Sequence, residues 1–455
     1  MIQEYPSANA PSHRRRRELG PRSWVLLWVW VVGLGALHAA AAGWDSPPGD
    51  QTAGRFWRLH WYERGLAHGN PSYERRFRIN SPEVVLHPQF GQRAEARENG
   101  LMLIGAEEDL FQLTGAELYL EMWGGHPGTA NKRFTVNGRS TYHLPRVGTE
   151  EKHCTYFYPS VPLKITDLVN GFNAFQFALD QGTTFWGHAL IDNACLRVAL
   201  TNGHRDLVAA GLPGFTATVQ ARPLTNGEGF ELTLDCPAAS QAAIAAVDFQ
   251  GWYYGYDENG NTLRTDWHGF TKQRQPMAQV GTCTNAPFQL AWDTALLPAQ
   301  KDVAVRAIVH FRHASTLVFV TAATRGLEIG DRAASQVNLL APHDLPAGFW
   351  SRARQKKQCH FDLDLDPARI EQAELHVVAW TGGPGTVKDY FTLNGQPFPV
   401  AEGDRHELVY SRQRVDPRIL RRGLNRIELL SDTEHHGIEI CLPGPAVMVR
   451  YRAGP

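Results

Sequence analysis

The feature that most constrains the fold is a segment that occurs twice. Residues 116–138 read AELYLEMWGGHPGTANKRFTVNG, and residues 373–395 read AELHVVAWTGGPGTVKDYFTLNG. About half of the aligned positions are identical, and most of these are strand, Gly-rich loop or Asn-Gly turn residues. Two copies so far apart indicate two homologous domains rather than a solenoid, whose repeats are short and contiguous.

Short runs of alternating polar and apolar residues recur along the chain, as in LYLEM, FELTL and HFDLDL, with Gly, Pro, Asn and Asp between them. This pattern predicts many short strands and an all-β protein. We expect two homologous β-sandwiches over residues 55–204 and 331–455, with a third sandwich over 205–330. Within each repeat strand, alternation places Leu118 and Leu375 toward the core and Trp123 and Trp380 on the opposite face.

Composition and the N-terminal segment limit the classes of function. The 455 residues contain 45 Lys and Arg and 46 Asp and Glu, for a net charge of −1, which argues against a nucleic-acid-binding protein. Residues 13–22 are basic, 24–37 are apolar and 38–43 are small, a pattern typical of a signal peptide over residues 1–42. We expect cleavage near Ala42, a linker over 43–54 and a secreted or periplasmic protein without a membrane contact; an uncleaved anchor is the alternative.

Export makes disulfides plausible for the six cysteines. Pairing them consecutively puts one bridge in each expected domain, as Cys154–Cys195, Cys236–Cys283 and Cys359–Cys441. Buried free thiols are the alternative interpretation.

The two outer segments, with the A-E-L strand, Gly-rich loop, F-T-x-N-G hairpin and later G-x-N strand, resemble galactose-binding-like jelly-roll modules. The middle segment, with GYDENGN, DWHG and APFQLAWDT, resembles the Ig-like domains found beside such modules in secreted bacterial proteins. The resemblance implies jelly-roll sandwiches flanking an Ig-like sandwich. It also implies a role associated with carbohydrate, because such modules accompany glycoside hydrolases and polysaccharide lyases.

Aromatic residues provide the candidate sugar contacts. Trp123 and Trp380 are duplicated and end their strands beside a Gly-rich loop, where an exposed indole could stack on a sugar ring. The run GWYYGYDENGNTLRTDWHGF over 251–270 adds Tyr254, Tyr256, Trp267 and His268. The alternative is that these rings pack against their own loops, the core or another domain.

The same run offers oxygen ligands for a structural calcium ion, namely Asp257, Asn259, Asn261 and Asp266. Their spacing departs from an EF-hand, and a hairpin with an Asn-Gly turn explains the segment equally well. No other cofactor is indicated.

No catalytic or metalloenzyme motif stands out. Histidine clusters at His435, His436 and Glu439 and at Glu150, Glu151 and His153 lack a metalloenzyme spacing. The acidic residues that could serve a glycosidase are Glu107, Glu108, Asp109, Glu117, Glu121 and Asp180. Sequence alone cannot pair such carboxyl groups.

The leading hypothesis is a secreted, non-catalytic protein that binds carbohydrate or another extracellular polymer. A glycan-degrading enzyme with its site on a sandwich face or at a domain junction is the first alternative. A structural or adhesion protein of the cell envelope is the second.

Overall fold

The chain divides into two units, residues 1–39 and 40–455. The computed structural model describes residues 43–50, 53–71, 76–79, 95, 100–126, 128–146, 148–149, 151–180, 189–256, 258–259, 263–330, 334–402, 406–434 and 437–452. The predicted signal peptide lies outside this part of the chain. Within it, none of the helices has the length and apolar character needed to span a membrane.

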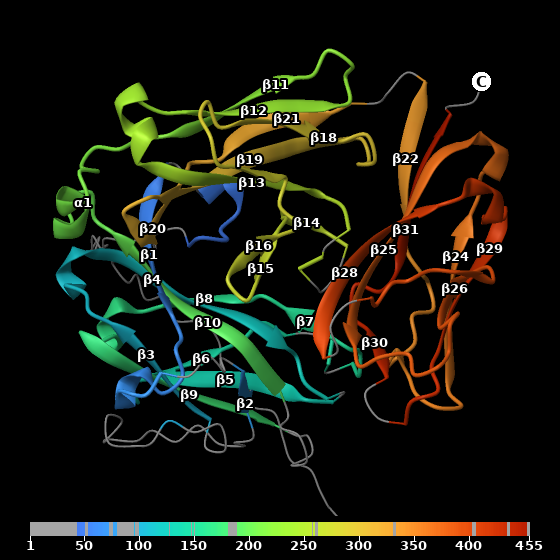
Figure 1. Ribbon diagram of the computed structural model, residues 1–455, viewed down its shortest axis with the longest axis horizontal. Helices are drawn as coiled ribbons and strands as arrows, with labels where there is room; N and C mark the ends of the chain where they lie inside the picture. Colours follow the sequence, from blue (N-terminus) through green and yellow to red (C-terminus); the bar gives the residue numbers. More distant parts are fainter. Residues whose placement is uncertain are drawn as a thin grey trace, which may run out of the picture. The chain divides into compact units, whose positions relative to one another are not determined.

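The described chain is almost entirely β, as predicted, and its strands form six sheets (Figure 1). The largest runs in the order β14 (Thr265–Trp267), β13 (Ile244–Tyr254), β19 (Gln300–Phe311), β20 (Ala314–Val320), β1 (Arg55–Trp61), β10 (Ala189–Leu200), β4 (Leu113–Trp123) and β7 (Tyr156–Phe157). Its additional strands are β17 (Gly281–Cys283), β2 (Phe77–Ile79), β21 (Thr324–Ile329) and β8 (Ser160–Leu163).

Two smaller sheets complete the first copy and the middle segment. They run β3 (Leu101–Ala106), β9 (Gly171–Asp180), β5 (Ala130–Val136), β6 (Ser140–His143), and β11 (Thr218–Pro223), β12 (Gly229–Asp235), β18 (Gln289–Asp293). The middle segment also carries the hairpin β15 (Phe270–Lys272) and β16 (Gln275–Met277), and the short helix α1 (Arg205–Ala209) precedes it.

The second copy, drawn from orange to red in Figure 1, has two sheets of its own. One runs β22 (Ser335–Leu340), β31 (Ala446–Arg452), β25 (Ile370–Thr381), β30 (Ile438–Ile440) and β23 (Trp350–Ser351), with β28 (Glu407–Val415) also paired to β25. The other runs β24 (Lys356–Leu363), β29 (Gly423–Leu430), β26 (Phe391–Leu393) and β27 (Gln396–Pro397).

The two copies of the repeat have matching strand orders. The first copy has β1-β10-β4-β8 facing β3-β9-β5-β6, and the second has β22-β31-β25-β28 facing β24-β29-β26-β27. Alternation along the repeat strands is also confirmed, because Leu118 and Leu120 of β4 enter one core while Leu375 and Val377 of β25 enter another. The jelly-roll and Ig-like assignments of these sandwiches stay predictions.

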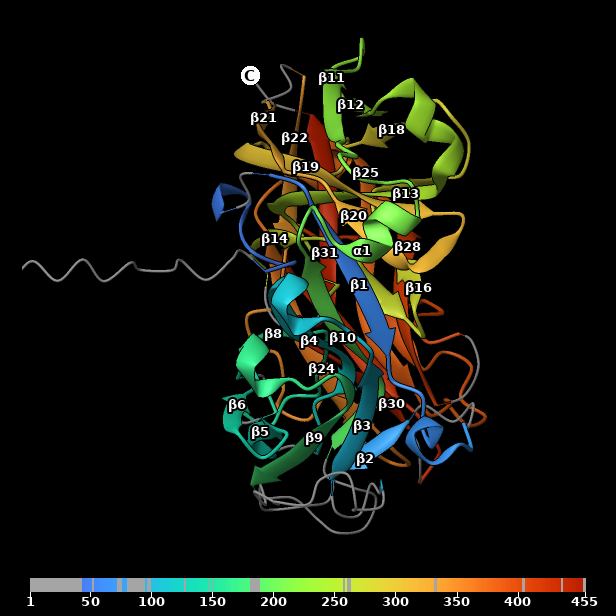
Figure 2. The same cartoon turned by 90° about the vertical axis from the view of Figure 1, so that its left-hand side faces the viewer.

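One strand joins two of the expected domains. Strand β1 pairs with β10 of the first copy on one edge and with β20 of the middle segment on the other (Figure 2). Trp57 faces Ala199 in one pairing and Val318 in the other, so the hydrogen-bonded ladder does not break at the predicted boundary of 204/205. A single hydrophobic core likewise contains residues of both segments.

Candidate functional site

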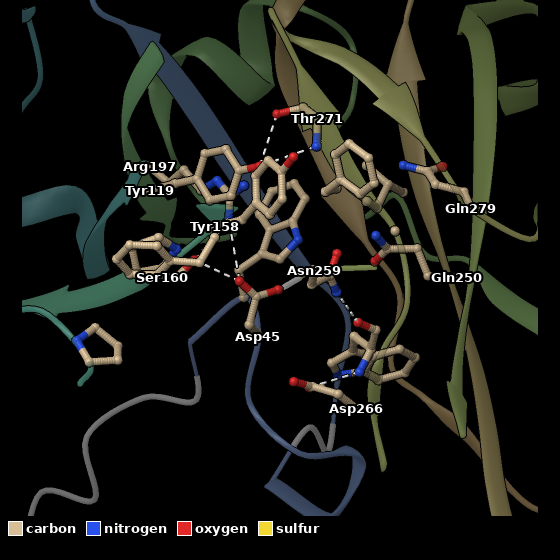
Figure 3. A pocket seen from close by; sticks show the side chains of 18 of the residues that line it. Asp45, Tyr119, Tyr158, Ser160, Arg197, Gln250, Asn259, Asp266, Thr271 and Gln279 are labelled. Carbon is tan, nitrogen blue, oxygen red and sulfur yellow. Dashed lines mark hydrogen bonds and ion pairs between the residues drawn. The ribbon is translucent and has the colours of Figure 1, made fainter. Parts of the chain in front are cut away.

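A cavity of about 440 Å³ lies where the outer face of the first copy meets the middle segment. Strands β4, β8 and β10 form one side, and strands β13 to β15 form the other. Six aromatic rings line it: Trp44, Tyr119, Phe157, Tyr158, Trp267 and Phe270. Between them lie planar polar groups, including Asp45, Arg197, Gln250, Asn259, Asp266 and Gln279 (Figure 3).

Arg197 forms one charged wall of the cavity. Its guanidinium lies 3.1 Å from Oε1 of buried Glu117, and the backbone N–H of Trp44 donates to Oε2 of the same carboxylate at 3.0 Å. The guanidinium also stacks over the rings of Tyr119, at 3.9 Å, and Trp44, at 4.4 Å. Burial raises the pKa of Glu117, and the Arg197 charge opposes that rise.

Arg306 supports several residues that line the cavity. It is fully buried, donates to Oε1 of Gln250 at 2.9 Å and to the carbonyl of Trp44, and lies 4.0 Å from the Trp267 ring. Its ion-pair partner Asp45 is 3.3 Å away. Burial lowers the pKa of Arg306 to about 10, so it stays charged at neutral pH. The two arginines hold neighbouring aromatic rings in place by cation–π contact.

Two polar atoms at the cavity have no hydrogen-bond partner within the described residues. They are the hydroxyl of Tyr158 and the side-chain oxygen Oε1 of Gln279. The neighbouring hydroxyl of Tyr119, by contrast, bonds to Thr271 at 3.0 Å. Buried polar atoms normally have partners, so the two exceptions are positions where a ligand could supply the missing bonds.

Glu121 fastens the hairpin β15–β16 beside the cavity. Its carboxylate accepts from the hydroxyl of Thr271 at 2.6 Å and from the backbone N–H groups of Gln273 and Arg274 at 2.7 and 3.2 Å. The carboxylate thus connects the outer face of the first copy to the middle segment, and holds the aromatic wall that Phe270 provides.

Of the predicted sugar-contact residues, Trp267 lines the cavity and the others lie outside it. His268 is buried, stacks on Tyr253 at 3.6 Å and bonds to Glu258 at 3.1 Å. Tyr256 is buried and donates to the carbonyl of Gly444 at 2.8 Å. Tyr254 is exposed on the surface. Whether these residues contact a sugar stays a prediction.

Trp123 and Trp380 do lie on the outer faces of their strands, and both are half-buried in one hydrophobic cluster. We call it the junction cluster, because Tyr156 of the first copy, Tyr256 of the middle segment and Val378 of the second copy all contribute. The structure therefore brings the duplicated tryptophans together, which sequence reasoning did not anticipate. Their sugar stacking stays a prediction.

Two of the predicted calcium ligands, Asn259 and Asp266, belong to the described residues. Strands β13 and β14 pair in antiparallel register, as the alternative interpretation expected. Asn259 donates to the carbonyl of Trp267 at 2.7 Å, and Asp266 accepts the backbone N–H of Trp267 at 2.8 Å and pairs with Arg264. Asp257 and Asn261 lie outside the described residues, so the calcium site stays a prediction.

One group of side chains has the proximity of metal ligands: Glu108, His204 and Asp206. The guanidinium of Arg58 already lies 3.1 Å from Glu108 and 2.7 Å from Asp206. Nδ1 of His204 accepts the backbone N–H of Asp206 at 3.2 Å, so a neutral ring carries its proton on Nε2, which then has no lone pair for a metal. We therefore interpret this group as an ion-pair network.

The other candidate acids and histidines serve the fold or lie apart from the cavity. Asp109 caps a short 3₁₀ turn, Asp180 pairs with Arg133 at 2.7 Å, Glu151 pairs with Arg146 at 3.1 Å, and Glu107 is exposed. His153 is half-buried, and Glu150, His435 and His436 lie outside the described residues.

In the structure all six cysteines are free thiols, including the members of the predicted pairs Cys154–Cys195, Cys236–Cys283 and Cys359–Cys441. Cys154 instead packs in the junction cluster with Cys441, whereas Cys359 lies in the core of the second copy. The thiol of Cys283 donates to the carbonyl of Gln289 at 3.3 Å. Whether the cysteines pair on export stays a prediction.

Sequence reasoning missed most of the cavity. Trp44 and Asp45 fall in the predicted linker, yet Trp44 is buried against Glu117 and both residues line the site. Arg197 could have been noticed from the sequence, because it is a single charged residue in the otherwise apolar strand LRVAL. No sequence pattern singles out Tyr158 and Gln279, because they come together only where distant segments of the chain meet.

Comparison with known proteins adds little. No family model matches the chain, and no curated protein does. A β-porphyranase of glycoside hydrolase family 86 from Bacteroides plebeius aligns over 52% of this chain and 37% of its own, with 10% identity and a TM-score of 0.23. An exo-β-1,3-galactanase from Phanerochaete chrysosporium aligns over 77% and 78%, with 9% identity and a TM-score of 0.16. The chain spans about a third of the length of the family 86 structures, and likenesses this slight assign neither fold nor function.

Proposed function

We propose that this is a secreted, non-catalytic carbohydrate-binding protein that holds a short oligosaccharide in the cavity between the first copy and the middle segment. The observation that carries the proposal is the composition of that cavity. Aromatic rings and planar polar groups from two segments alternate around it, and Tyr158 and Gln279 offer polar atoms without partners in the described chain.

The size and chemistry of the cavity suit a sugar. Small-molecule sites typically enclose about 300–1,000 Å³ and combine apolar walls with a few placed polar groups. Aromatic faces can pack against the C–H faces of a pyranose, while amide, hydroxyl and guanidinium groups bond its hydroxyls. The lining carries both signs of charge, which favours a polar ligand over a strongly ionic one.

Hydrolysis is less well supported than binding. A glycosidase usually needs one carboxyl group as acid and another as base or nucleophile. The carboxylates at this cavity are Asp45 and Asp266, and both are engaged: Asp45 accepts from Ser160 at 2.6 Å and pairs with Arg306, while Asp266 accepts from Trp267 and pairs with Arg264. Burial raises the pKa of Asp266, but its oxygens are already committed to the hairpin.

A glycan array and pull-down by insoluble polysaccharides test the proposal. We expect the wild type to bind at least one glycan, and Tyr158→Phe combined with Gln279→Ala to weaken that affinity about tenfold through lost hydrogen bonds. Phe111→Ala, an exposed ring outside the cavity, is the control and should bind as the wild type does. Blank arrays and pull-downs would contradict the proposal, and the release of new reducing ends would favour an enzyme.

A further inference from the structure

Three tryptophans surround one carboxyl group at the junction of the two copies. In the sheet of the second copy, Glu439 of β30 faces Trp350 of β23 on one edge and Trp380 of β25 on the other. Directly opposed residues of neighbouring strands point to the same face of a sheet. With strands about 4.8 Å apart, the two indoles flank Glu439 at a mutual spacing of about 10 Å.

This row lies on the outer face of the sheet. Ile438 and Ile440, on either side of Glu439, both enter the core of the second copy, so Glu439 must point the other way. Trp350 and Trp380 are each half-buried at the edge of the junction cluster. Each residue therefore packs against the apolar cluster and is partly exposed to solvent.

The first copy supplies the third tryptophan. Trp123, the counterpart of Trp380 in the repeat, lies close enough to Glu439 for its indole N–H to lower the pKa of that carboxyl group. Its ring meets His126 edge-on at 5.1 Å, while His406 stacks beside Trp380 at 5.6 Å. The duplicated tryptophans thus contribute to one place on the molecule rather than to two equivalent sites.

We propose that Trp123, Trp350, Trp380 and Glu439 form a second glycan-contact surface, which a chain longer than the cavity's ligand would reach. The inference rests on the proposed carbohydrate function. Indole rings provide flat apolar faces with a polar edge, and the carboxyl group between them can bond sugar hydroxyls. Because two linked sites raise the effective concentration of each other's ligand, long glycans should bind more tightly than short ones.

The surroundings of Glu439 make this surface sensitive to pH. Burial raises the pKa of Glu439 to about 7, an effect that Arg352 and the Trp123 N–H partly oppose. The nearby thiols of Cys154 and Cys441 have pKa values raised by burial and stay protonated, and Lys357 lies 5.7 Å over the Trp350 ring. Below pH 7 Glu439 is a neutral donor and acceptor; above pH 7 it accepts only, so affinity for a neutral glycan should change through this range.

The test uses the full chain and the best polysaccharide from the array, cut to a series of oligosaccharide lengths. We expect Trp350→Ala to weaken binding of the longest oligosaccharide about tenfold, as loss of an aromatic anchor commonly does, and to leave the shortest unaffected. Glu439→Gln should remove the change of affinity through pH 7. Phe111→Ala, a fully exposed ring far along the first copy, is the control.

The outcomes separate the two proposals. If the wild type binds no glycan, the carbohydrate function itself fails. If the wild type binds and the cavity variants weaken it, while Trp350→Ala binds long chains normally and the wild-type pH profile is flat, only the second surface is refuted. Should Trp350→Ala fail to fold, as its melting temperature would show, the pH profiles of the wild type and Glu439→Gln decide.

Discussion

The two copies of the repeat have the same buried hydrogen bonds but differ in the residues that surround their outer faces. In the first copy, Nδ2 of Asn137 donates to Oδ1 of Asn173 at 2.8 Å; in the second, Asn394 donates to Asn425 at the same distance. Asn137 and Asn394 both adopt positive φ, 49° and 52°, in the Asn-Gly turns. Asn173 and Asn425 each bond two backbone carbonyls and one N–H of the preceding loop. Duplication thus preserved a buried polar brace down to individual atoms.

The outer faces of strands β4 and β25 differ in burial. Glu117 of β4 is buried and pairs with Arg197, which lines the cavity. Its counterpart Glu374 of β25 is partly exposed and pairs with Arg412 at 2.9 Å, a side chain 58% exposed. The same residue at the same position of the repeat therefore holds a cavity-lining arginine in one copy and forms a surface ion pair in the other. The copies share their scaffold, and they differ in the burial of their outer faces.

The matched glutamates provide the largest expected contrast. Glu117→Ala leaves Arg197 buried without its main partner and should lower the free energy of unfolding by about 3–5 kcal/mol. Glu374→Ala removes a mostly solvated pair and should cost less than about 1 kcal/mol. Urea unfolding of both variants measures the difference. Equal costs would show that the two outer faces are not distinct environments.

The paired asparagines should behave alike. Asn173→Ala and Asn425→Ala each leave several buried backbone groups unbonded, and each should destabilise the protein by about 2–3 kcal/mol. Chemical denaturation followed by circular dichroism gives both values. A large cost in one copy and none in the other would contradict a shared brace.

Tyr256 tests how the middle segment attaches to the second copy. Its hydroxyl donates to the carbonyl of Gly444 at 2.8 Å and accepts the N–H of Val378 at 3.1 Å. Tyr256→Phe should therefore lower the unfolding free energy by about 1–2 kcal/mol. Exposed Tyr254→Phe serves as control. An unchanged melting temperature for Tyr256→Phe would mean that these bonds do not hold the segments together.

The smallest contrast is in pH dependence. Burial raises the folded-state pKa of Glu439 to about 7, so its contribution to stability is present below its unfolded pKa and lost as pH rises through about 7. The proximity of His376, at 3.5 Å, and of Arg412 lowers the pKa of Glu374 to about 2. The contribution of Glu374 to stability is therefore present at neutral pH and lost as pH falls toward 2. Glu439→Gln should remove about 1 kcal/mol of the change in unfolding free energy that occurs as pH passes through 7, and Glu374→Gln should leave that change as it is. Thermal melts of both variants between pH 5 and pH 8 measure this difference. A flattened pH dependence in Glu374→Gln but not in Glu439→Gln would contradict the prediction.

The sequence predicted those features that depend on residues close together in the chain. Alternation placed Leu118 and Leu375 in their cores, and the Asn-Gly turns fell where the repeat predicted them. It failed where distant segments meet. Trp44 was assigned to the linker because its partner Glu117 lies 73 residues away in the sequence. Glu439 was grouped only with His435 and His436 because the tryptophans opposite it, Trp350 and Trp380, are distant in the sequence.

Strand β1 has a consequence for how the chain could be divided. Because its two edges belong to different segments, a fragment ending at residue 204 would lose β20 and expose one edge of β1. A fragment beginning at 205 would expose β20 in the same way. Unpaired strand edges promote aggregation. Neither fragment could therefore be moved into another protein by recombination as an intact folded unit. The second copy keeps its two sheets to itself and is the portion of this architecture that evolution could move alone.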